Sequence, residues 1–314
     1  MAEPIAFFQG RVIPLDEAKV GIRTHAFLYG TAVFEGIRGN WNEDEGVTYL
    51  FRVREHYQRL RLSCRILKIG LPYTDDELCD ITADLVARSG YREDLYIRPI
   101  AYKSEEALGP RLHDIADDFL IFVQPFGPYL DADKGIRCLT STWRRVDDLG
   151  IPARAKVNGL YVNSALAKTE ALENGFDEAI MLDERGHVSE GSGENIFIVR
   201  DGMLITPPPS DNILEGITRE SIIAIARDEM GIETRERSID RSELYVADEC
   251  FMTGTAAHVT AVIEVDRRPV GAGEPGDVTK RISSFFHDTI RGRDEKYAKW
   301  LTAVKPQVRQ GVKA

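Results

Sequence analysis

Four short segments carry residue types that packing alone does not explain, and the first centres on a lysine. In the segment 151–168, IPARAKVNGLYVNSALAK, Lys156 precedes Asn158-Gly159 and an expected helix. A lysine beside a flexible turn can be placed in a cleft, where burial and nearby cations lower its pKa and make it an amine nucleophile. The alternative is a solvated loop lysine. Lys168, late in the same helix, serves as a comparison because it resembles a surface charge.

The second segment, HVSEGSGENIFIV at 187–199, places an acid beside a glycine-rich bend. Glu190 precedes Gly191-Ser192-Gly193, which lies between two expected strands. Glycines such as Gly193 let the backbone approach a flat ligand closely, and a carboxylate there could pair with a protonated ring nitrogen. The alternative is an ordinary hairpin turn with a solvated glutamate.

The third and fourth segments offer donors for an anion. In LEGITRESIIAIA at 214–226, Ile217 and Thr218 stand at an expected helix N-terminus, where unpaired N–H groups and the helix dipole suit a phosphate. The alternative is a plain threonine cap. In FMTGTAAH at 251–258, the turn at 254–256 offers N–H and hydroxyl donors, or is simply a tight turn.

Together these segments supply an amine, an acid for a ring nitrogen and two donor sites for a phosphate, the combination that a pyridoxal phosphate site needs. Other chemistries lack their motifs, since the sequence has no GxxxxGK[ST], HExxH or GxSxG pattern and no Cys/His cluster with zinc spacing. The six histidines are isolated, so we expect no metal. The Gly-Ser-Gly bend precedes a strand rather than a helix, which argues against a dinucleotide fingerprint.

The elements that must position these residues follow from periodicity. Residues 52–68 carry one apolar helical face, and Thr74 with Glu77 forms a capping box for the next helix, which Gly90 ends. In the expected strand 94–102, alternation puts Tyr96 and Arg98 side by side on one face. The other expected elements are a hairpin at 5–12, strands at 118–124, 177–182, 194–200, 203–206 and 249–253, and helices at 161–174, 218–230 and 277–290.

Composition restricts the class of protein. The length of 314 residues favours two domains, and a hydrophobic fraction of 43% is enough for a sizeable core. We place the domains at 1–126 and 138–314 with a linker at 127–137. A net charge of −11 argues against nucleic acid and anionic membranes as partners. No apolar stretch reaches membrane-spanning length and no signal peptide opens the chain. Because the four cysteines are scattered, we expect a soluble cytoplasmic protein.

Seven ordered motifs resemble those of one enzyme family. The motifs are HAFLYGTAVFEGIR, FRVREHYQRL, YIRP, the Lys156 segment, SEGSGENIF, GITR and MTGTAA. They are similar to the fold-type-IV pyridoxal 5'-phosphate enzymes, which have the D-amino acid aminotransferase-like fold, and above all to bacterial branched-chain amino acid aminotransferases. The resemblance runs from about residue 7 to 290. It implies an α/β or α+β two-domain protein with a small N-terminal and a larger C-terminal domain.

The resemblance also implies roles for individual residues. Lys156 would be the Schiff-base lysine and proton shuttle, and Glu190 would pair with the pyridine nitrogen. The phosphate would be held by Arg54, Ile217, Thr218 and Thr255. Tyr161 would bind the phenolic O3′, Leu214 would pack on the ring, and Gly193 would lie against the cofactor. The substrate pocket would be lined by Tyr29, Phe34, Gly36, Arg38, Tyr96, Arg98, Tyr129 and Ala256.

The implied reaction transfers the amino group of leucine, isoleucine or valine to 2-oxoglutarate in a homodimer or larger homo-oligomer, with amino acids and 2-oxo acids as partners. One segment departs from the family pattern, because residues 103–113 replace a more glycine-rich loop. D-amino acid and (R)-amine transaminases also differ there, so these activities, alone or combined, are alternatives. Aminodeoxychorismate lyase is another, as is a non-enzymatic binding protein with an idle Lys156. Arg111 and His113 receive no role.

Overall fold

The computed structural model describes residues 4–127, 130 and 134–307, and the chain divides into two compact units. Unit 1 comprises residues 1–127, 155–159 and 288–314, and unit 2 comprises 128–154 and 160–287. The first boundary falls within the expected linker at 127–137. The chain then returns to unit 1 twice, so the expected domain at 138–314 is corrected. For the same reason the two units are nearly equal in length, and the expected size difference is not observed.

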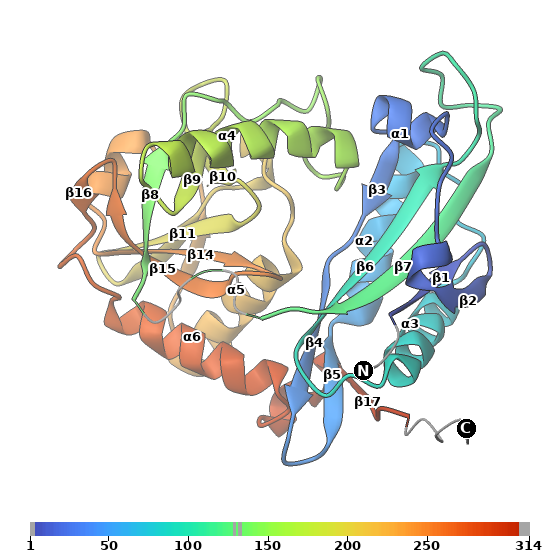
Figure 1. Cartoon of the computed structure of the whole chain (residues 1–314). Helices are drawn as coiled ribbons and strands as arrows, with labels where there is room; N and C mark the ends of the chain where they lie inside the picture. The colour runs from blue at the N-terminus through green and yellow to red at the C-terminus, as the bar shows by residue number, and fades with distance from the viewer. Residues whose placement is uncertain (1–3, 128–129, 131–133, 308–314) are drawn as a thin grey trace. The chain divides into compact units, whose positions relative to one another are not determined.

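Unit 1 is built on an antiparallel sheet with the strand order β17-β5-β4-β6-β7-β1-β2, and β3 also pairs with β6 (Figure 1). Antiparallel pairing and segregated helices make this unit α+β. Its strands are β1 (Ile5–Phe8), β2 (Arg11–Pro14), β3 (Ala32–Phe34), β4 (Ile37–Asn42), β5 (Val47–Phe51), β6 (Leu95–Lys103), β7 (Asp117–Pro125) and β17 (Leu301–Val304).

The local predictions for unit 1 are confirmed where strand and helix periods are clear. β1 and β2 form the expected hairpin, and β6 buries Leu95, Ile97 and Ala101 while Tyr96 and Arg98 stay half-buried. Thr74 forms the capping box with Glu77 at the start of α3. The helices of this unit are α1 (His25–Tyr29), α2 (Val53–Ile66) and α3 (Asp75–Ser89), with the short 3-10 helices η1 (Leu15–Glu17) and η5 (Glu295–Trp300). α2 and α3 pack together and cover β3, β1 and β7.

Unit 2 is built on a mixed sheet with the order β10-β9-β8-β15-β14-β11-β12-β13, and β16 pairs with β15. The pairs β8–β9, β8–β15 and β12–β13 are parallel, and the others are antiparallel. Its strands are β8 (Ile136–Thr140), β9 (Glu178–Leu182), β10 (Val188–Gly191), β11 (Asn195–Arg200), β12 (Met203–Thr206), β13 (Thr234–Glu236), β14 (Glu249–Gly254), β15 (His258–Val265) and β16 (Arg268–Pro269).

Helices cover this second sheet. α4 packs on β9 and α5 on β14 and β13. The helices of this unit are α4 (Tyr161–Glu173), α5 (Ile217–Met230) and most of α6 (Asp277–Ile290), with the 3-10 helices η3 (Pro209–Asp211) and η4 (Arg241–Tyr245). The 3-10 helix η2 (Asn158–Leu160) begins in unit 1 and ends at the first residue of the second segment of unit 2. The core between the layers is aliphatic, with Ile136, Ile196, Ile198, Val262 and Val265 all buried.

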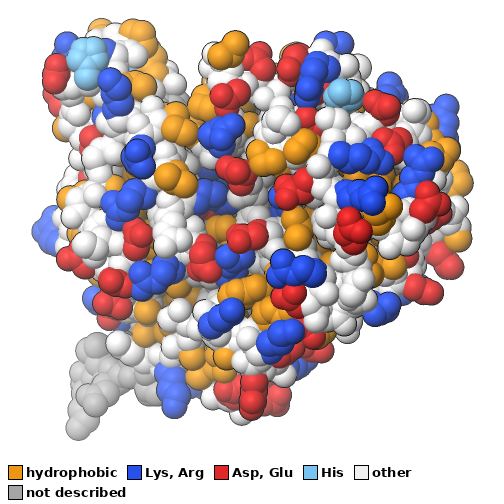
Figure 2. Space-filling model, turned by 180° about the vertical axis from the view of Figure 1, so that it is seen from behind, with side chains coloured by type: hydrophobic (Ala, Val, Ile, Leu, Met, Phe, Trp, Pro, Cys, Tyr) orange, Lys and Arg blue, Asp and Glu red, His pale blue; other side chains and the backbone are white. Residues whose placement is uncertain are grey.

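Charged side chains of both signs are interspersed over the face shown in Figure 2, with apolar side chains between them. Among the described residues, no helix is both long enough and apolar enough to cross a bilayer. All four cysteines are thiols without a disulfide partner, and three of them are buried.

Candidate active site

Lys156 lies in the short segment that returns to unit 1, and its backbone is fixed there from two sides. Its carbonyl accepts a hydrogen bond from the N–H of Phe34 at 3.0 Å, and its own N–H donates to Ser63 Oγ on α2 at 3.2 Å. A β-bridge between Val33 and Val157 continues this pairing. The amine of the half-buried Lys156 lies 5.0 Å from the centre of the buried Phe34 ring. The lysine is therefore held in place and is not a loosely solvated loop residue.

Arg98 and Tyr96 lie beside the same phenylalanine, as the strand pattern predicts. The Arg98 guanidinium stands 4.2 Å from the Phe34 ring centre and donates from Nη2 to the Tyr96 hydroxyl at 2.8 Å. Gly36 leaves the space that this hydroxyl occupies, because a Cβ on Gly36 would lie 2.2 Å from it. Phe34, Gly36, Tyr96, Arg98 and Lys156 thus form one cluster in unit 1, with a cation and an amine over an aromatic floor.

Arg54, the predicted phosphate ligand, points elsewhere. Its side chain is 52% exposed and pairs with Asp76 of α3. Arg59, from the same FRVREHYQRL motif, is only 12% exposed. Arg59 and Ser63 lie one turn apart on one face of α2, and Ser63 contacts the Lys156 backbone. The assignment of Arg54 is therefore corrected, and Arg59 is the arginine of this motif on the Lys156 side of the helix.

A fully buried carboxylate orients Arg59. Glu35 accepts from Arg59 Nε at 2.7 Å and Nη2 at 2.8 Å, and from His56 Nδ1 at 2.7 Å. Burial by itself would raise the pKa of Glu35, but Arg59 and His56 outweigh it and lower that pKa to about 2. Burial lowers the pKa of His56. A carboxylate can only accept, so Nδ1 carries the proton of a neutral His56.

Tyr29 is tied to the loop that departs from the family pattern. Its hydroxyl accepts from the N–H of Gly109 at 3.0 Å, and the buried His25 contacts the Gly109 carbonyl through Nε2 at 3.0 Å. The His25 and Tyr29 rings lie 4.7 Å apart, so the loop at 104–116 sets where Tyr29 points. Arg111 and His113 are exposed. The expected substrate contact Tyr129 lies outside the described residues.

Arg38 is buried on β4 and already has a carboxylate nearby. Its Nη2 lies 3.7 Å from Asp94 Oδ2 and donates to the Gly127 carbonyl at 3.3 Å. Among the described residues, its Nε and Nη1 make no hydrogen bond. Burial lowers the pKa of this guanidinium, while Asp94 acts in the opposite direction. Arg38 is therefore less available to a substrate carboxylate than Arg98.

In unit 2, Glu190 is a buried carboxylate held by three donors. Arg145 Nη2 approaches Oε1 at 2.7 Å, while Asn195 Nδ2 and the N–H of Leu214 reach Oε2 at 2.9 and 3.0 Å. Asn195 also donates to the Leu214 carbonyl at 2.8 Å, so Leu214 is fixed through both backbone groups. Glu190 is not a solvated turn residue. These contacts fix the positions of both carboxylate oxygens.

The other predicted residues of unit 2 lie at two chain turns. Ile217 and Thr218 are the first two residues of α5 and are buried, and the N-cap Gly216 has no capping side chain. Thr255 and Ala256 are half-buried in the turn that joins β14 to β15. Tyr161, the first residue of α4, is half-buried, and Gly193 is exposed. The positive end of the α5 helix dipole therefore lies at Ile217 and Thr218, a position that suits an anion.

Lys168 differs from the surface charge that the sequence suggests. It is half-buried and donates from Nζ to the buried Glu178 at 2.6 Å and to the Asp177 carbonyl at 2.7 Å. Glu194, buried in the SEGSGENIF motif, lies close enough to Glu178 to be affected by its charge. Burial and the Glu178 charge raise the pKa of Glu194 to about 8. Lys168 thus has a structural role as the counter-ion of a buried acid.

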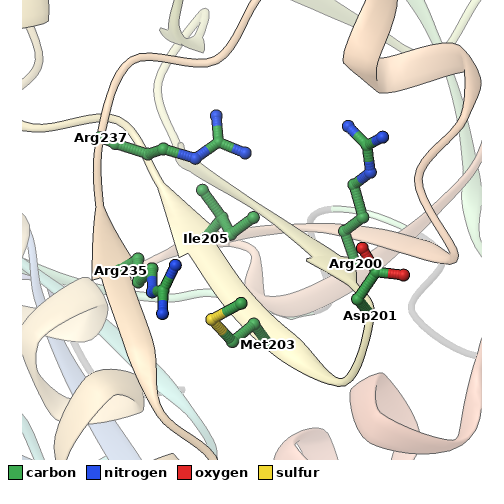
Figure 3. A pocket seen from close by; sticks show the side chains of 6 residues that line it. All are labelled: Arg200, Asp201, Met203, Ile205, Arg235 and Arg237. Carbon is green, nitrogen blue, oxygen red and sulfur yellow. The ribbon is translucent and has the colours of Figure 1, made fainter.

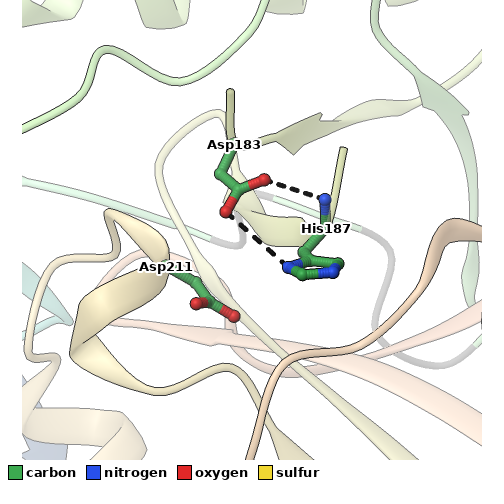
Figure 4. Close-up of side chains that lie close together, drawn as sticks. All are labelled: Asp183, His187 and Asp211. Carbon is green, nitrogen blue, oxygen red and sulfur yellow. Dashed lines mark hydrogen bonds and ion pairs between the residues drawn. The ribbon is translucent and has the colours of Figure 1, made fainter. Parts of the chain in front are cut away.

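Asp183, His187 and Asp211 bring possible metal-ligand atoms within 4.8 Å of one another in unit 2 (Figure 4). Arg185 supplies the positive charge there, because its Nη2 lies 2.8 Å from Asp183 Oδ2 and 2.6 Å from Asp211 Oδ1. Asp183 also accepts from the backbone N–H of His187 at 2.8 Å. We assign no metal ion to this group.

The sheets, the Lys156 segment and the Glu190 motif together define a class of enzyme. The amino-transferase class IV family model matches residues 32–265, and the chain belongs to that family. Its fold is the aminotransferase class IV fold, with mixed helices and strands.

Within the family, three similar proteins are branched-chain aminotransferases by name. A "probable branched-chain-amino-acid aminotransferase" of Aquifex aeolicus is 52% identical over 95% of this chain and 96% of its own. The branched-chain aminotransferase of Thermoproteus uzoniensis with norvaline is 44% identical, with a TM-score of 0.92 over 96% of this chain and 99% of that one. The "T.th." branched-chain amino acid aminotransferase complexed with N-(5'-phosphopyridoxyl)-L-glutamate is 42% identical, with a TM-score of 0.90 over 96% and 99% of the two chains.

Proposed function

We propose that this chain is a pyridoxal 5'-phosphate-dependent transaminase that moves the amino group of leucine, isoleucine or valine to 2-oxoglutarate. The observation that carries the proposal is the Lys156 amine, held over Phe34 beside the buried Glu35–Arg59 pair. The similar proteins support it, since one was crystallised with norvaline and another with a phosphopyridoxyl-glutamate adduct. The proposal includes a homodimer or larger homo-oligomer in the cytoplasm, where the unpaired thiols stay reduced.

The chemistry of the available groups fits the cofactor. Unit 1 provides an amine for an aldehyde in Lys156 and a well-oriented guanidinium for a phosphate in Arg59. Unit 2 provides a buried carboxylate for a ring nitrogen in Glu190 and the first turn of α5 for phosphate oxygens. Bound pyridoxal phosphate supplies the aldehyde and an electron-accepting ring, which is chemistry that no side chain has.

The chain's own residues then have distinct tasks. Lys156 would hold the cofactor through its aldehyde group, and whenever its amine is released it would carry a proton to and from the substrate carbon. Glu190 keeps the ring nitrogen protonated, and Arg145 and Asn195 fix its two oxygens. Tyr161 binds the phenolic oxygen and Leu214 packs on the ring, while Arg59, Ile217, Thr218 and Thr255 bind the phosphate and Gly193 lies against the cofactor. Of the described residues, we propose Tyr29, Phe34, Gly36, Arg38, Tyr96, Arg98 and Ala256 as substrate contacts.

Replacing the two lysines of the same segment tests the proposal. Purified protein should absorb visible light, and borohydride should link the cofactor covalently to Lys156. Lys156→Ala should abolish transamination and the covalent link. Lys168→Ala should keep both, although it leaves the buried Glu178 without its cation and lowers thermal stability. If Lys168→Ala removes the link and Lys156→Ala keeps it, the assignment is wrong.

A further inference from the structure

Three arginines line a pocket in unit 2 that none of the roles above uses (Figure 3). The pocket has a volume of about 140 Å³ and is lined by Arg200, Asp201, Met203, Ile205, Arg235 and Arg237. These residues come from β11, β12, β13, the turn between β11 and β12, and the residue that directly follows β13. The pocket therefore lies on one face of the last three strands of the mixed sheet.

Strand register brings the arginines to this common face. Arg200 is opposite Met203, and Ile205 is opposite Arg235, so the side chains of each pair point to the same side. Arg237 follows two residues after Arg235, and its N–H donates to the Thr206 carbonyl at 3.1 Å, which continues the ladder. Figure 3 shows Arg235 and Arg237 on one side of Ile205 and Arg200 on the other. The convergence is thus built into the sheet.

The floor of the pocket is apolar. Ile205 is only 3% exposed and belongs to the buried core of unit 2, and Met203 is half-buried. Charges above an apolar floor interact more strongly with an anion than charges surrounded by water on all sides. No aromatic ring lines the pocket among the described residues, so a nucleobase would gain no stacking there.

The protein only partly neutralises the three guanidinium groups. Glu243 is shared, since it accepts from Arg237 Nη1 and Nη2 at 2.8 and 2.7 Å and lies 3.2 Å from Arg200 Nη1. Arg235 has one ion pair among the described residues, a 3.4 Å contact to the exposed Glu233. Asp201 is the one acid that lines the pocket within the described part of the chain. The six lining side chains thus carry three positive charges and one negative charge, and Glu243 and Glu233 lie beside them as counter-ions.

We propose that this pocket binds a small oxyanion of the phosphate class, either inorganic phosphate or the phosphate group of a phosphomonoester. Guanidinium groups present paired donors that match phosphate oxygens, and three of them line this pocket. The volume of about 140 Å³ exceeds the roughly 30 Å³ that one water occupies in the liquid, so a phosphate-sized ion fits. The site is separate from the residues proposed for the cofactor phosphate, and its occupancy does not depend on transamination.

The test uses the holoenzyme, so that the cofactor fills its own phosphate site. Inorganic phosphate and glycerol phosphate are titrated at constant ionic strength, and binding is followed by calorimetry and by phosphorus NMR. Wild-type protein should bind at least one of them saturably with one site per chain. Arg235→Gln should weaken binding by roughly tenfold or more, the effect of losing one charge-assisted hydrogen bond. The affinity of Arg235→Lys should lie between those of the wild type and Arg235→Gln, because lysine keeps the charge but lacks the paired donors.

Arg88→Gln is the matched control. Arg88 is also exposed and also makes one ion pair at 3.4 Å, with Asp84, but it lies on α3 in unit 1. It should leave the affinity unchanged. Tighter binding of glycerol phosphate would identify a phosphomonoester as the ligand, and equal or weaker binding would identify the free ion. Equal losses in Arg235→Gln and Arg88→Gln, or binding that does not saturate in the wild type, would overturn the proposal.

Discussion

Glu35 and Arg59 form a two-point ion pair inside unit 1, with Arg59 Nε 2.7 Å from one carboxylate oxygen and Nη2 2.8 Å from the other. Two parallel contacts fix the plane of a guanidinium as well as its position. The sequence places Glu35 directly after Phe34, on which the Lys156 amine lies. The same short stretch of chain therefore positions both the amine and the cation that we assign to the cofactor phosphate.

The first prediction separates the two arginines of the motif. Arg59→Gln should weaken the binding of pyridoxal phosphate to the apoenzyme by about 10–150-fold, the range for one charge-assisted hydrogen bond of about 1.5–3 kcal/mol. Arg54→Gln should change it little, because Arg54 pairs with Asp76 on the surface. Fluorescence titration of the apoenzyme measures both. A loss in Arg54→Gln with none in Arg59→Gln would restore Arg54 as the phosphate ligand.

The second prediction concerns Glu35 as the residue that orients Arg59. Glu35→Gln should weaken pyridoxal phosphate binding but leave the binding of pyridoxal, which has no phosphate, nearly unchanged. A purely structural loss would weaken both ligands alike, so the ratio of the two affinities is the informative quantity. If Glu35→Gln is too unstable to isolate, Arg59→Lys provides the same comparison, because it keeps the charge and loses the paired geometry.

The third prediction follows from the Glu35 pKa. Since that pKa is lowered from 4.5 to about 2 in the folded chain, the unfolded chain binds the proton first as the pH falls. The stabilisation is complete above about pH 5.5 and is lost as the pH falls through 4.5 toward 2, and it amounts to about 3 kcal/mol. Urea unfolding gives the free energy of unfolding of the wild type and of Glu35→Gln at each pH. The difference between the two free energies should be largest near pH 7 and should shrink as the pH falls to about 3. A difference in the free energy of unfolding that stays constant with pH would contradict the prediction.

Much of this architecture could be predicted because local rules specify it. The alternation in β6 placed Tyr96 and Arg98 correctly, and the Thr74 capping box began α3 where expected. The structure contradicts the assignment of Arg54, which is exposed and pairs with Asp76, although the helix that carries it forms as expected. Helical spacing places Arg59 near His56 and Ser63 and places Arg54 near Arg61, which faces Asp75. Motif order alone does not distinguish the two arginines, whereas the face of the helix does.

Other features required the tertiary structure. Arg145 contacts Glu190 across 45 residues of sequence, and no local pattern marks a buried arginine of that kind. The return of residues 155–159 and 288–314 to unit 1 was missed for the same reason, since β17 pairs with β5 across most of the chain. Lys168 looked like a surface charge because its buried partner Glu178 lies on another element.

The fourth prediction concerns Glu190. Glu190→Gln removes the charge that keeps a ring nitrogen protonated, so turnover should fall by about 10–150-fold if a contact of about 1.5–3 kcal/mol is fully expressed in the barrier. Arg145 would then face a neutral amide in a buried site, so thermal stability should be measured alongside turnover. Turnover close to wild type in a well-folded variant would count decisively against this role.

The last prediction concerns how one pocket accepts both an apolar side chain and the second carboxylate of glutamate or 2-oxoglutarate. Arg98 suits the carboxylate, because it lies over Phe34 and Tyr96 and has no carboxylate partner among the described residues. Its Nε is buried without a hydrogen bond, so a donor remains for a ligand. Arg38 also has buried donors without a hydrogen bond, but it differs from Arg98 in having a carboxylate, that of Asp94, 3.7 Å from its guanidinium.

Arg98→Ala should therefore slow the half-reaction with 2-oxoglutarate by about 10–150-fold, the cost of one charged contact, and the half-reaction with leucine much less. Leucine has no second carboxylate. For the leucine half-reaction, the variant therefore loses only the packing of the Arg98 stem against Phe34 and Tyr96. Arg98→Lys should restore part of the 2-oxoglutarate rate because it keeps a cation at the aromatic floor. Stopped-flow spectra of each half-reaction measure the two rates separately. Equal losses would mean that Arg98 serves the scaffold or the carboxylate common to all substrates, and Arg38 or Arg111 would have to bind the distal carboxylate.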